Sequence, residues 1–335
     1  MAALKLLGIT IPEAYGGAGL NALALAIVLE EVAAVDGAAA LILASHNSLC
    51  TSHLYVFGNE DQRKRYVMPL AQGKTLGAWA LTEAGSGSDA AAMETRAVLS
   101  GDEWVINGGK LFITQGSTAG IYVIMARTNP EKGNKGISAF VVARDTPGLS
   151  IGKIEKKLGV RASDTAALYF ENLRLPKENL VGELDHAYEN VLSILDGGRI
   201  GIAAMALGLA RGVMTRSIAY AGRRSQFGKT LGAFQAIQAK LSDMATEIDA
   251  ARLLIYQAAF LKDAGKPFQM AASEAKLFAS ELANRVTNQA IQIHGGLGLM
   301  QEAEVERYFR DMKLCEIGEG TSEIQRMVIA KNLLR

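Results

Sequence analysis

A glutamate flanked by glycines, Glu319, is the strongest candidate for chemistry in this sequence. It lies in the segment Ile317-Gly-Glu-Gly-Thr-Ser-Glu-Ile-Gln325. Glycines on both sides let the backbone approach a flat ligand and leave the carboxylate on a segment with few side chains. A carboxylate that loses hydration against an apolar ligand has a raised pKa, which suits a general base near neutral pH. Taken alone, the segment is equally consistent with an exposed glutamate beside a helix start.

The residues after Glu319 predict the helix that would position it. Ser322 and Gln325 form an S-x-x-Q pattern, which is typical of a capping box at a helix N-terminus. Ile324, Met327 and Val328 then give the helix an apolar face. We therefore expect Glu319 to lie in the loop just before this helix.

Three other segments could bind a phosphate or a flat cofactor. Gly85-Ser-Gly-Ser-Asp-Ala90 fits the G-x-G-x-x-A dinucleotide pattern, but strand-like runs follow it instead of a βαβ unit. We interpret it as a polar loop whose amides approach a ligand. The glycines of Gln292–Gly298 could face a phosphate or form an ordinary helix C-cap. Arg224 could hold a phosphate or merely lie on a turn.

A metal site is not expected, although three potential ligands share one helix face. His46, Cys50 and His53 are spaced i, i+4 and i+7. No carboxylate or further histidine completes a ligand set nearby. We interpret these residues as a polar face that packs against a neighbour or lines a groove.

Length and composition describe the chain that must position these residues. It has 335 residues, 49% hydrophobic and 21% charged, enough for two or three folded domains. A net charge of +1 gives no general reason to expect a nucleic acid or an anionic membrane as partner. Two cysteines make no disulfide framework. The apolar run 200–210 is too short to span a bilayer, and no secretory signal is expected at the N-terminus.

Proline positions and periodicity predict a helix, sheet, helix order. After Pro176 only Pro267 remains, so the second half can form long helices over 187–223, 243–260, 273–294 and the end of the chain. In the third helix Leu277 is among the residues expected on the apolar face. Short β-rich runs fill 103–170, with a hairpin expected at Asn107-Gly108. The expected domains are 1–76, 77–185 and 186–335.

Taken together, these segments resemble the acyl-CoA dehydrogenase family over essentially the whole chain. The matching segments, in order, are Leu7–Gly17, Leu81–Asp89, Asn107–Thr114, Arg224–Gly228, Gln292–Gly296 and Glu319–Gln325. The resemblance implies a mainly α fold with a central β-domain. Its parts would be a shortened N-terminal helical domain, an antiparallel β-barrel or sandwich and a C-terminal four-helix bundle, assembled as a homotetramer.

The same resemblance implies a flavoprotein oxidoreductase of fatty-acid β-oxidation. It would convert an acyl-CoA to a trans-2-enoyl-CoA with FAD and pass electrons to an electron-transfer flavoprotein. Glu319 would remove the α-proton while flavin N5 accepts the β-hydride. Some relatives carry the base at the position of Gly198 instead, where this chain has no carboxylate. The expected location is the cytoplasm, or the mitochondrial matrix in a eukaryote.

The resemblance also implies the residues that bind cofactor and substrate. FAD would contact, within one subunit, Trp79, Leu81, Thr82, Gly87, Ser88, Phe112, Thr114, Thr321 and Glu323. The FAD of a neighbouring subunit would contact Arg224, Gln226, Phe227, Gln235, Gln292, Gly295 and Gly296. The acyl-CoA would contact Ser88, Asp196, Arg199, Gly320 and Lys331.

Departures from the family pattern leave the substrate open. Gly318 stands where many members have a tyrosine, which favours a longer, branched or cyclic acyl chain. Lys331 replaces an arginine and loses bidentate geometry. The absence of Lys and Arg from 33–52 argues against a glutaryl-CoA-type enzyme. Two alternatives stay open: an acyl-CoA oxidase-like flavoprotein that uses oxygen, and a non-catalytic helical CoA-binding protein.

Overall fold

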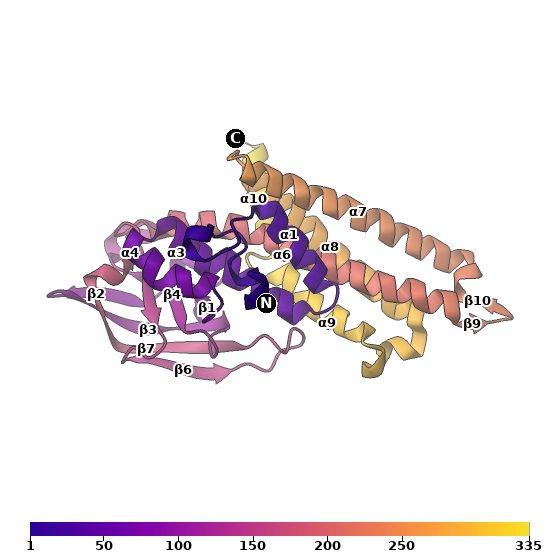
Figure 1. Ribbon diagram of the computed structural model, residues 1–335, viewed down its shortest axis with the longest axis horizontal. Coiled ribbons are helices and arrows are strands. Elements are labelled where there is room, and N and C mark those ends of the chain that lie inside the picture. Colours follow the sequence, from indigo (N-terminus) through magenta and orange to yellow (C-terminus); the bar gives the residue numbers. More distant parts are fainter. Residues whose placement is uncertain (335) are drawn as a thin grey trace. The chain divides into compact units, whose positions relative to one another are not determined.

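A mixed β-sheet and a set of long helices form two units of this chain (Figure 1). The structure, a computed structural model, describes residues 1–334. The first unit comprises residues 1–21, 42–156 and 163–198, and the second comprises 22–41, 157–162 and the chain from 199 onward. The expected boundaries at 76 and 185 stay a prediction.

The first unit is built on a sheet of eight strands. Their order is β6-β7-β3-β2-β4-β5-β8, and β1 pairs with β4. The strands are β1 (Gly77–Ala80), β2 (Arg96–Ser100), β3 (Glu103–Thr114), β4 (Ile121–Arg127), β5 (Ile137–Ala143), β6 (Leu149–Ile154), β7 (Thr165–Pro176) and β8 (Leu180–Val181). Most pairs are antiparallel, as expected, but β4 runs parallel to both β1 and β2.

Strand β4 separates two hydrophobic cores, because successive side chains of a strand point to opposite faces. Ile121, Val123 and Met125 enter a core with two short helices, α3 (Ser52–Phe57) and α5 (Met68–Ala71), and with nearby π-helical turns. The short helix α4 (Glu60–Gln62) lies between them in the chain and contributes no side chain to this core. Tyr122 and Ile124 enter a second core with side chains of β3 and β7. The sheet thus packs against itself on one face and against helices on the other, which confirms a central β-domain.

The hairpin expected at Asn107-Gly108 is wrong. Both residues lie inside β3, and the chain turns instead at Gly101, whose φ is 64°. The pairing of β3 with β7 shifts register between Ile106 and Gly108, so the Asn-Gly pair marks a bulge. A Cβ at Gly108 would lie 2.6 Å from Thr95 Oγ1. Glycine is required there because Thr95, just before β2, lies against this position of β3, and not because the chain turns.

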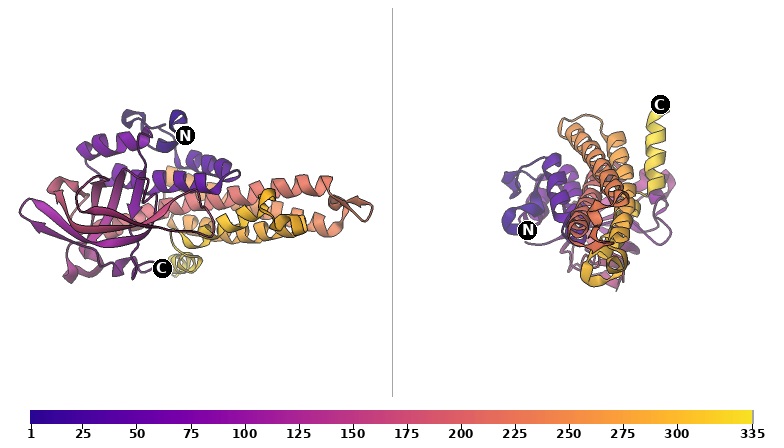
Figure 2. Two further views of the ribbon diagram at one scale, coloured as in Figure 1. Left: turned by 90° about the horizontal axis from the view of Figure 1, so that it is seen from below. Right: turned by 90° about the vertical axis from the view of Figure 1, so that its right-hand side faces the viewer.

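The second unit is helical. Its long helices are α1 (Ala22–Ala33), α7 (Gln235–Asp263), α8 (Gln269–His294), α9 (Val305–Ile317) and α10 (Ser322–Leu333). Helices α2 (Gly37–Ser45) and α6 (Ala187–Arg223) belong partly to each unit. Figures 1 and 2 show α6, α7 and α8 side by side, with a ribbon of β9 (Ser225–Gln226) and β10 (Lys229–Thr230) between α6 and α7.

The predicted helical periodicity is confirmed in α7 and needs one correction in α8. Met244, Ile248 and Ile255 are buried, as their spacing predicts. In α8, Leu277 is only partly buried, whereas its neighbour Lys276 is completely buried. The other residues predicted for this apolar face are buried as expected: Ala283, Val286, Ala290 and Ile293. Only at Leu277 is the pattern wrong, because the adjacent buried position is taken by a lysine.

Helix α6 is long and apolar enough to cross a membrane by length and composition. However, 83% of its most apolar window is buried inside the structure, which is usual for a core helix. The apolar run 200–210 is thus the middle of a 37-residue packed helix.

Helices α1 and α6 approach closely at glycines of α6. A Cβ at Gly212 would lie 2.1 Å from the carbonyl oxygen of Ala34, just after α1, and a backbone atom cannot move aside cheaply. We expect Gly212→Ala to lower the free energy of unfolding by about 2 to 3 kcal/mol through overpacking. Urea unfolding followed by circular dichroism measures the change.

Gly222→Ala on the same helix is the matched control. No atom lies within 4 Å of a Cβ at that position. It should raise the free energy of unfolding by about 0.5 kcal/mol, because alanine restricts the unfolded chain. Equal effects of the two substitutions would contradict the close packing at Gly212.

Candidate functional site

Glu319 lies in the short loop between α9 and α10, as expected. The N-cap of α10 is Thr321, whose hydroxyl accepts a hydrogen bond from the Ile324 amide at 3.4 Å. The capping box predicted from Ser322 and Gln325 is therefore wrong. Thr321 has the extended backbone of a cap residue (φ −60°, ψ 165°), whereas Ser322 is already helical.

The backbone at Glu319 adopts an unusual conformation. Its φ is 55°, and φ of Gly320 is 97°, so two successive residues lie in the left-handed region. A non-glycine residue there is uncommon and strained, and such strain concentrates at functional sites. The Oε2 atom of Glu319 is shielded from solvent and has no hydrogen-bond partner. An unsatisfied buried carboxylate oxygen is costly unless a ligand or a proton meets it.

Burial and nearby cations set the charge state of this carboxyl. Burial raises the pKa of Glu319 to about 7, although Lys276, Arg199 and Lys262 pull it down. These three cations come from α8, α6 and α7. A carboxyl with this pKa can take up and release a proton near neutral pH, which a general base must do.

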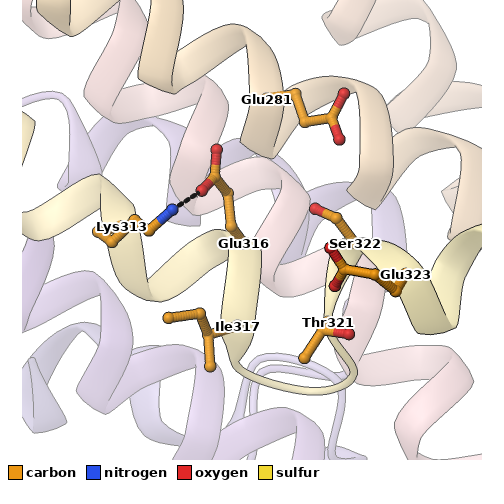
Figure 3. A pocket seen from close by; sticks show the side chains of 7 residues that line it. All are labelled: Glu281, Lys313, Glu316, Ile317, Thr321, Ser322 and Glu323. Carbon is orange, nitrogen blue, oxygen red and sulfur yellow. Dashed lines mark hydrogen bonds and ion pairs between the residues drawn. The ribbon is translucent and has the colours of Figure 1, made fainter.

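A cavity of about 320 Å³ lies beside the start of α10 (Figure 3). Its lining residues come from α8, α9, α10 and the preceding loop: Glu281, Lys313, Glu316, Ile317, Thr321, Ser322 and Glu323. Lys313 is paired with Glu316 across one side. The expected cofactor-binding residues Thr321 and Glu323 thus line a cavity, although Glu319 is not among its lining residues.

A second group of expected cofactor residues gathers at the ends of three helices. Arg224, Gln226 and Phe227 lie in or beside the β9–β10 ribbon, Gln235 begins α7, and Gln292, Gly295 and Gly296 lie at the end of α8. The ends of α6 and α8 touch, because the rings of Tyr220 and His294 stack at 4.3 Å. A cavity of about 380 Å³ lies beside this stack.

Phe227 is the most exposed aromatic residue of this group. It is 93% exposed and has φ 51°. The family resemblance implies that this ring meets the FAD of a neighbouring subunit, and its exposure leaves it accessible for such a contact. The Nδ1 atom of the His294 ring donates a hydrogen bond to the Ala290 carbonyl at 2.8 Å.

The expected flavin residues of the first unit gather on β1, on the glycine-rich loop after it and on β3. They are Trp79, Leu81, Thr82, Gly87, Ser88, Phe112 and Thr114. The Leu111 amide donates to the Thr82 carbonyl at 2.9 Å, which joins loop and strand. Phe112 is 62% exposed with φ 58°, and a Cβ at Gly87 would meet nothing within 4 Å. Within this group, Phe112 and the loop at Gly87 are thus exposed, whereas Trp79 and Leu81 are buried.

A buried ion pair, which the sequence did not reveal, anchors the glycine-rich loop. Lys110 Nζ lies 2.6 Å from Glu83 Oε1 and donates to the Leu81 carbonyl at 3.0 Å. Glu83 also accepts from the amides of Glu94 and Thr95 at the other end of the loop. Burial raises the pKa of Glu83, but Lys110 and these donors outweigh it and hold the pKa low. The sequence signal for this ion pair is Lys110 itself, a lysine at a position of β3 whose side chain points into the core.

The expected substrate residues belong to both units: Ser88 and Asp196 to the first, and Arg199, Gly320 and Lys331 to the second. Arg199 donates to Ser273 Oγ on α8 at 3.3 Å and acts electrostatically on Glu319, and Gly320 is next to that base candidate. Lys331 is exposed in the last turn of α10, and Asp196 is on the part of α6 that belongs to the first unit. Ser88 is exposed on the glycine-rich loop.

Two of the three potential metal ligands, His46 and His53, make hydrogen bonds within the protein. His46 Nδ1 accepts from the Gly77 amide at 3.1 Å, so its Nε2 carries the proton and donates to the Leu7 carbonyl at 2.9 Å. His53 Nδ1 accepts from Trp79 Nε1 at 3.2 Å. Within residues 1–334, no group of three or more His, Cys, Asp or Glu is arranged to hold a metal.

Three domain models of acyl-CoA dehydrogenases match this chain. The N-terminal domain model matches residues 1–74, the middle domain model 78–173 and the C-terminal domain model 188–334. A similar curated protein is a probable acyl-CoA dehydrogenase, YngJ, of Bacillus subtilis. It is 50% identical over 100% of this chain and 88% of its own length.

Solved structures resemble this chain throughout. Butyryl-CoA dehydrogenase from Megasphaera elsdenii has a TM-score of 0.98 at 43% identity, over 100% of this chain and 88% of its own. A chain in the structure of the electron transferring flavoprotein of Acidaminococcus fermentans has a TM-score of 0.99 at 45% identity, with the same coverage.

The ion pair under the glycine-rich loop can be tested by a double-mutant cycle. Lys110→Met leaves the buried Glu83 carboxylate without its cation, and we expect a loss of about 3 kcal/mol in the free energy of unfolding. Lys110→Met with Glu83→Gln should lose less than Lys110→Met alone, because no lone charge remains buried. Additive losses in urea unfolding would show that the pair is not coupled.

Proposed function

The chain belongs to the acyl-CoA dehydrogenase family, and from this premise we propose that Glu319 is the base that removes the α-proton of an acyl-CoA thioester. The protein is a flavin-dependent oxidoreductase whose cofactor is FAD and whose substrate class is acyl-CoA. The product is the corresponding trans-2-enoyl-CoA.

The orphaned Oε2 atom of Glu319 is the observation that carries this proposal. It is buried, has no partner and belongs to a carboxyl with a pKa of about 7. An α-proton approaching this oxygen would supply the missing hydrogen bond. Its transfer neutralises a carboxylate that burial already disfavours, so the desolvated site strengthens the base.

The residues present fit FAD. The first unit offers an exposed glycine-rich loop and the exposed ring of Phe112, and Gly87 leaves room for close approach of a flat ring. The loop is held from beneath by Lys110 and Glu83, so its amides are preorganised. Bound FAD supplies the acceptor for the β-hydride.

The acyl end of the site has space beside Gly318. A Cβ there would meet only Leu314, at 3.4 Å or more, so this side of the loop is not filled. One relative acts on butyryl-CoA. We assign this chain an acyl-CoA of short main chain, with the space at Gly318 able to take a branch or ring.

Partners and assembly follow from the same site. One similar chain was solved in the structure of an electron transferring flavoprotein, so we assign a protein of that kind as electron acceptor. The exposed Phe227 and the nearby Arg224 favour a homotetramer in which the β9–β10 ribbon of one subunit reaches the FAD of a neighbouring subunit. A bacterial cytoplasm or a mitochondrial matrix is the proposed location.

Replacing the base tests the assignment. Glu319→Gln should retain FAD and lose reductive bleaching by acyl-CoA by at least about 10³-fold, because an amide cannot accept the α-proton. Anaerobic stopped-flow absorbance with straight, branched and cyclic acyl-CoAs measures the loss. Glu178→Gln, at an exposed glutamate of the first unit, is the control and should bleach as the wild type does. Near-normal bleaching by Glu319→Gln would exclude Glu319 as base.

The pH dependence follows from the same carboxyl. The base must be ionised, and its pKa is about 7, so kcat/KM should fall tenfold per pH unit below about 7 and level off above it. A glutamate with its ordinary pKa would instead give a flat profile from pH 6 to 8. A pH profile of kcat/KM with one acyl-CoA distinguishes these outcomes.

A further inference from the structure

A completely buried lysine, Lys276, lies on α8 at the loop that carries Glu319. Neither the sequence motifs nor the proposed reaction uses it. Lysine is almost never fully buried unless a partner compensates for lost hydration. The nearby polar residues of α8, Ser273, Ser280 and Thr287, recur at helical spacing and are also buried.

The partner of this lysine is the backbone of the base loop. Lys276 Nζ donates a hydrogen bond to the Gly320 carbonyl at 2.6 Å. The buried Gln325 amide donates to the same carbonyl at 2.8 Å and to the Glu319 carbonyl at 3.4 Å. Two side chains from two helices therefore hold one carbonyl, directly after the left-handed backbone of Glu319.

We infer that Lys276 is a positioning residue for Glu319: its ammonium holds the Gly320 carbonyl, keeps the strained loop in place and so aims the base. This inference rests on the proposed function in taking Glu319 as the base. Strained backbone persists only where its surroundings over-determine it, and a charge-assisted hydrogen bond is the strongest such restraint on this loop.

Electrostatics adds a second consequence. Burial lowers the pKa of Lys276 to about 8, and Arg199 also lowers it, whereas Cys315, Glu319 and Glu316 raise it. Glu319 in turn faces Lys276, Arg199 and Lys262, and each of these cations favours its charged form. Loss of Lys276 should therefore raise the pKa of the base.

Three matched variants separate positioning from charge. Lys276→Met removes both the ammonium and its hydrogen bond. Gln325→Met removes a neutral donor to the same carbonyl and to the Glu319 carbonyl. Lys262→Met removes a nearby charge for which the structure gives no hydrogen bond to the loop. Lys266→Met, at an exposed lysine before α8, controls for a simple change in net charge.

The first readout needs neither FAD nor substrate. Hydrogen–deuterium exchange is followed in peptides covering 318–324. We expect exchange about tenfold faster in Lys276→Met, faster to a smaller degree in Gln325→Met, and unchanged in Lys262→Met and Lys266→Met. A correctly folded Lys276→Met with wild-type exchange would overturn the positioning role. If Lys276→Met does not fold, Lys276→Gln is tested against the same expectation.

The second readout is the pH profile of flavin bleaching in the FAD-loaded enzyme. For Lys276→Met we expect the acid limb to move up by about one pH unit and the rate on the alkaline plateau to fall about tenfold. For Lys262→Met we expect only a smaller shift of the limb. An unshifted limb with an unchanged plateau in Lys276→Met would overturn the inference. Failure of the wild type to bleach with any acyl-CoA would instead overturn the proposed function. The exchange experiment would still show whether Lys276 holds the loop in place.

Discussion

The carbonyl of Gly320 accepts two hydrogen bonds, and the placement of Glu319 depends on them. One donor is the ammonium of Lys276 and the other is the amide of Gln325. They hold a loop whose two central residues have positive φ, a conformation that alone would be unfavourable for a glutamate. Helices α8 and α10 thus each contribute one side chain that holds this peptide unit.

The glycine-rich loop of the first unit uses the same device. There the buried Lys110 holds the Leu81 carbonyl and Glu83, and Glu83 in turn holds two amides at the far end of the loop. In both places a lysine without access to solvent binds backbone that has no regular secondary structure. Because an unpaired buried charge is costly, these loops cannot move without a large penalty. In each of two segments expected to meet cofactor or substrate, a buried lysine therefore restrains the backbone through a hydrogen bond to a carbonyl.

Two short sequence motifs gave wrong predictions, because the same residues at the same spacing can serve a different structural purpose. Asn107-Gly108 is typical of a turn, but the glycine serves a close contact with Thr95 inside β3. Ser322 and Gln325 have capping-box spacing, but Gln325 satisfies a carbonyl instead of an amide. The burial of Lys276 was not predicted, because apolar periodicity places only hydrophobic residues on the buried face of a helix. Each failure concerns a residue whose contacts in the fold cannot be read from its immediate neighbours in the sequence.

The sequence by itself determined the order of helix, sheet and bundle, the family, and Glu319 as the candidate base. These depend on periodicity, proline positions and short motifs, which are properties of neighbours along the chain. Tertiary structure alone decided that Glu319 carries a solvent-shielded oxygen, that its pKa lies near 7, and that cations from α6, α7 and α8 surround it. Burial and charge interactions depend on distance in space, and residues such as Arg199 and Lys276 lie far from Glu319 in the sequence. The position of the candidate base could therefore be predicted from the sequence, but the burial and the charges that set its pKa could not.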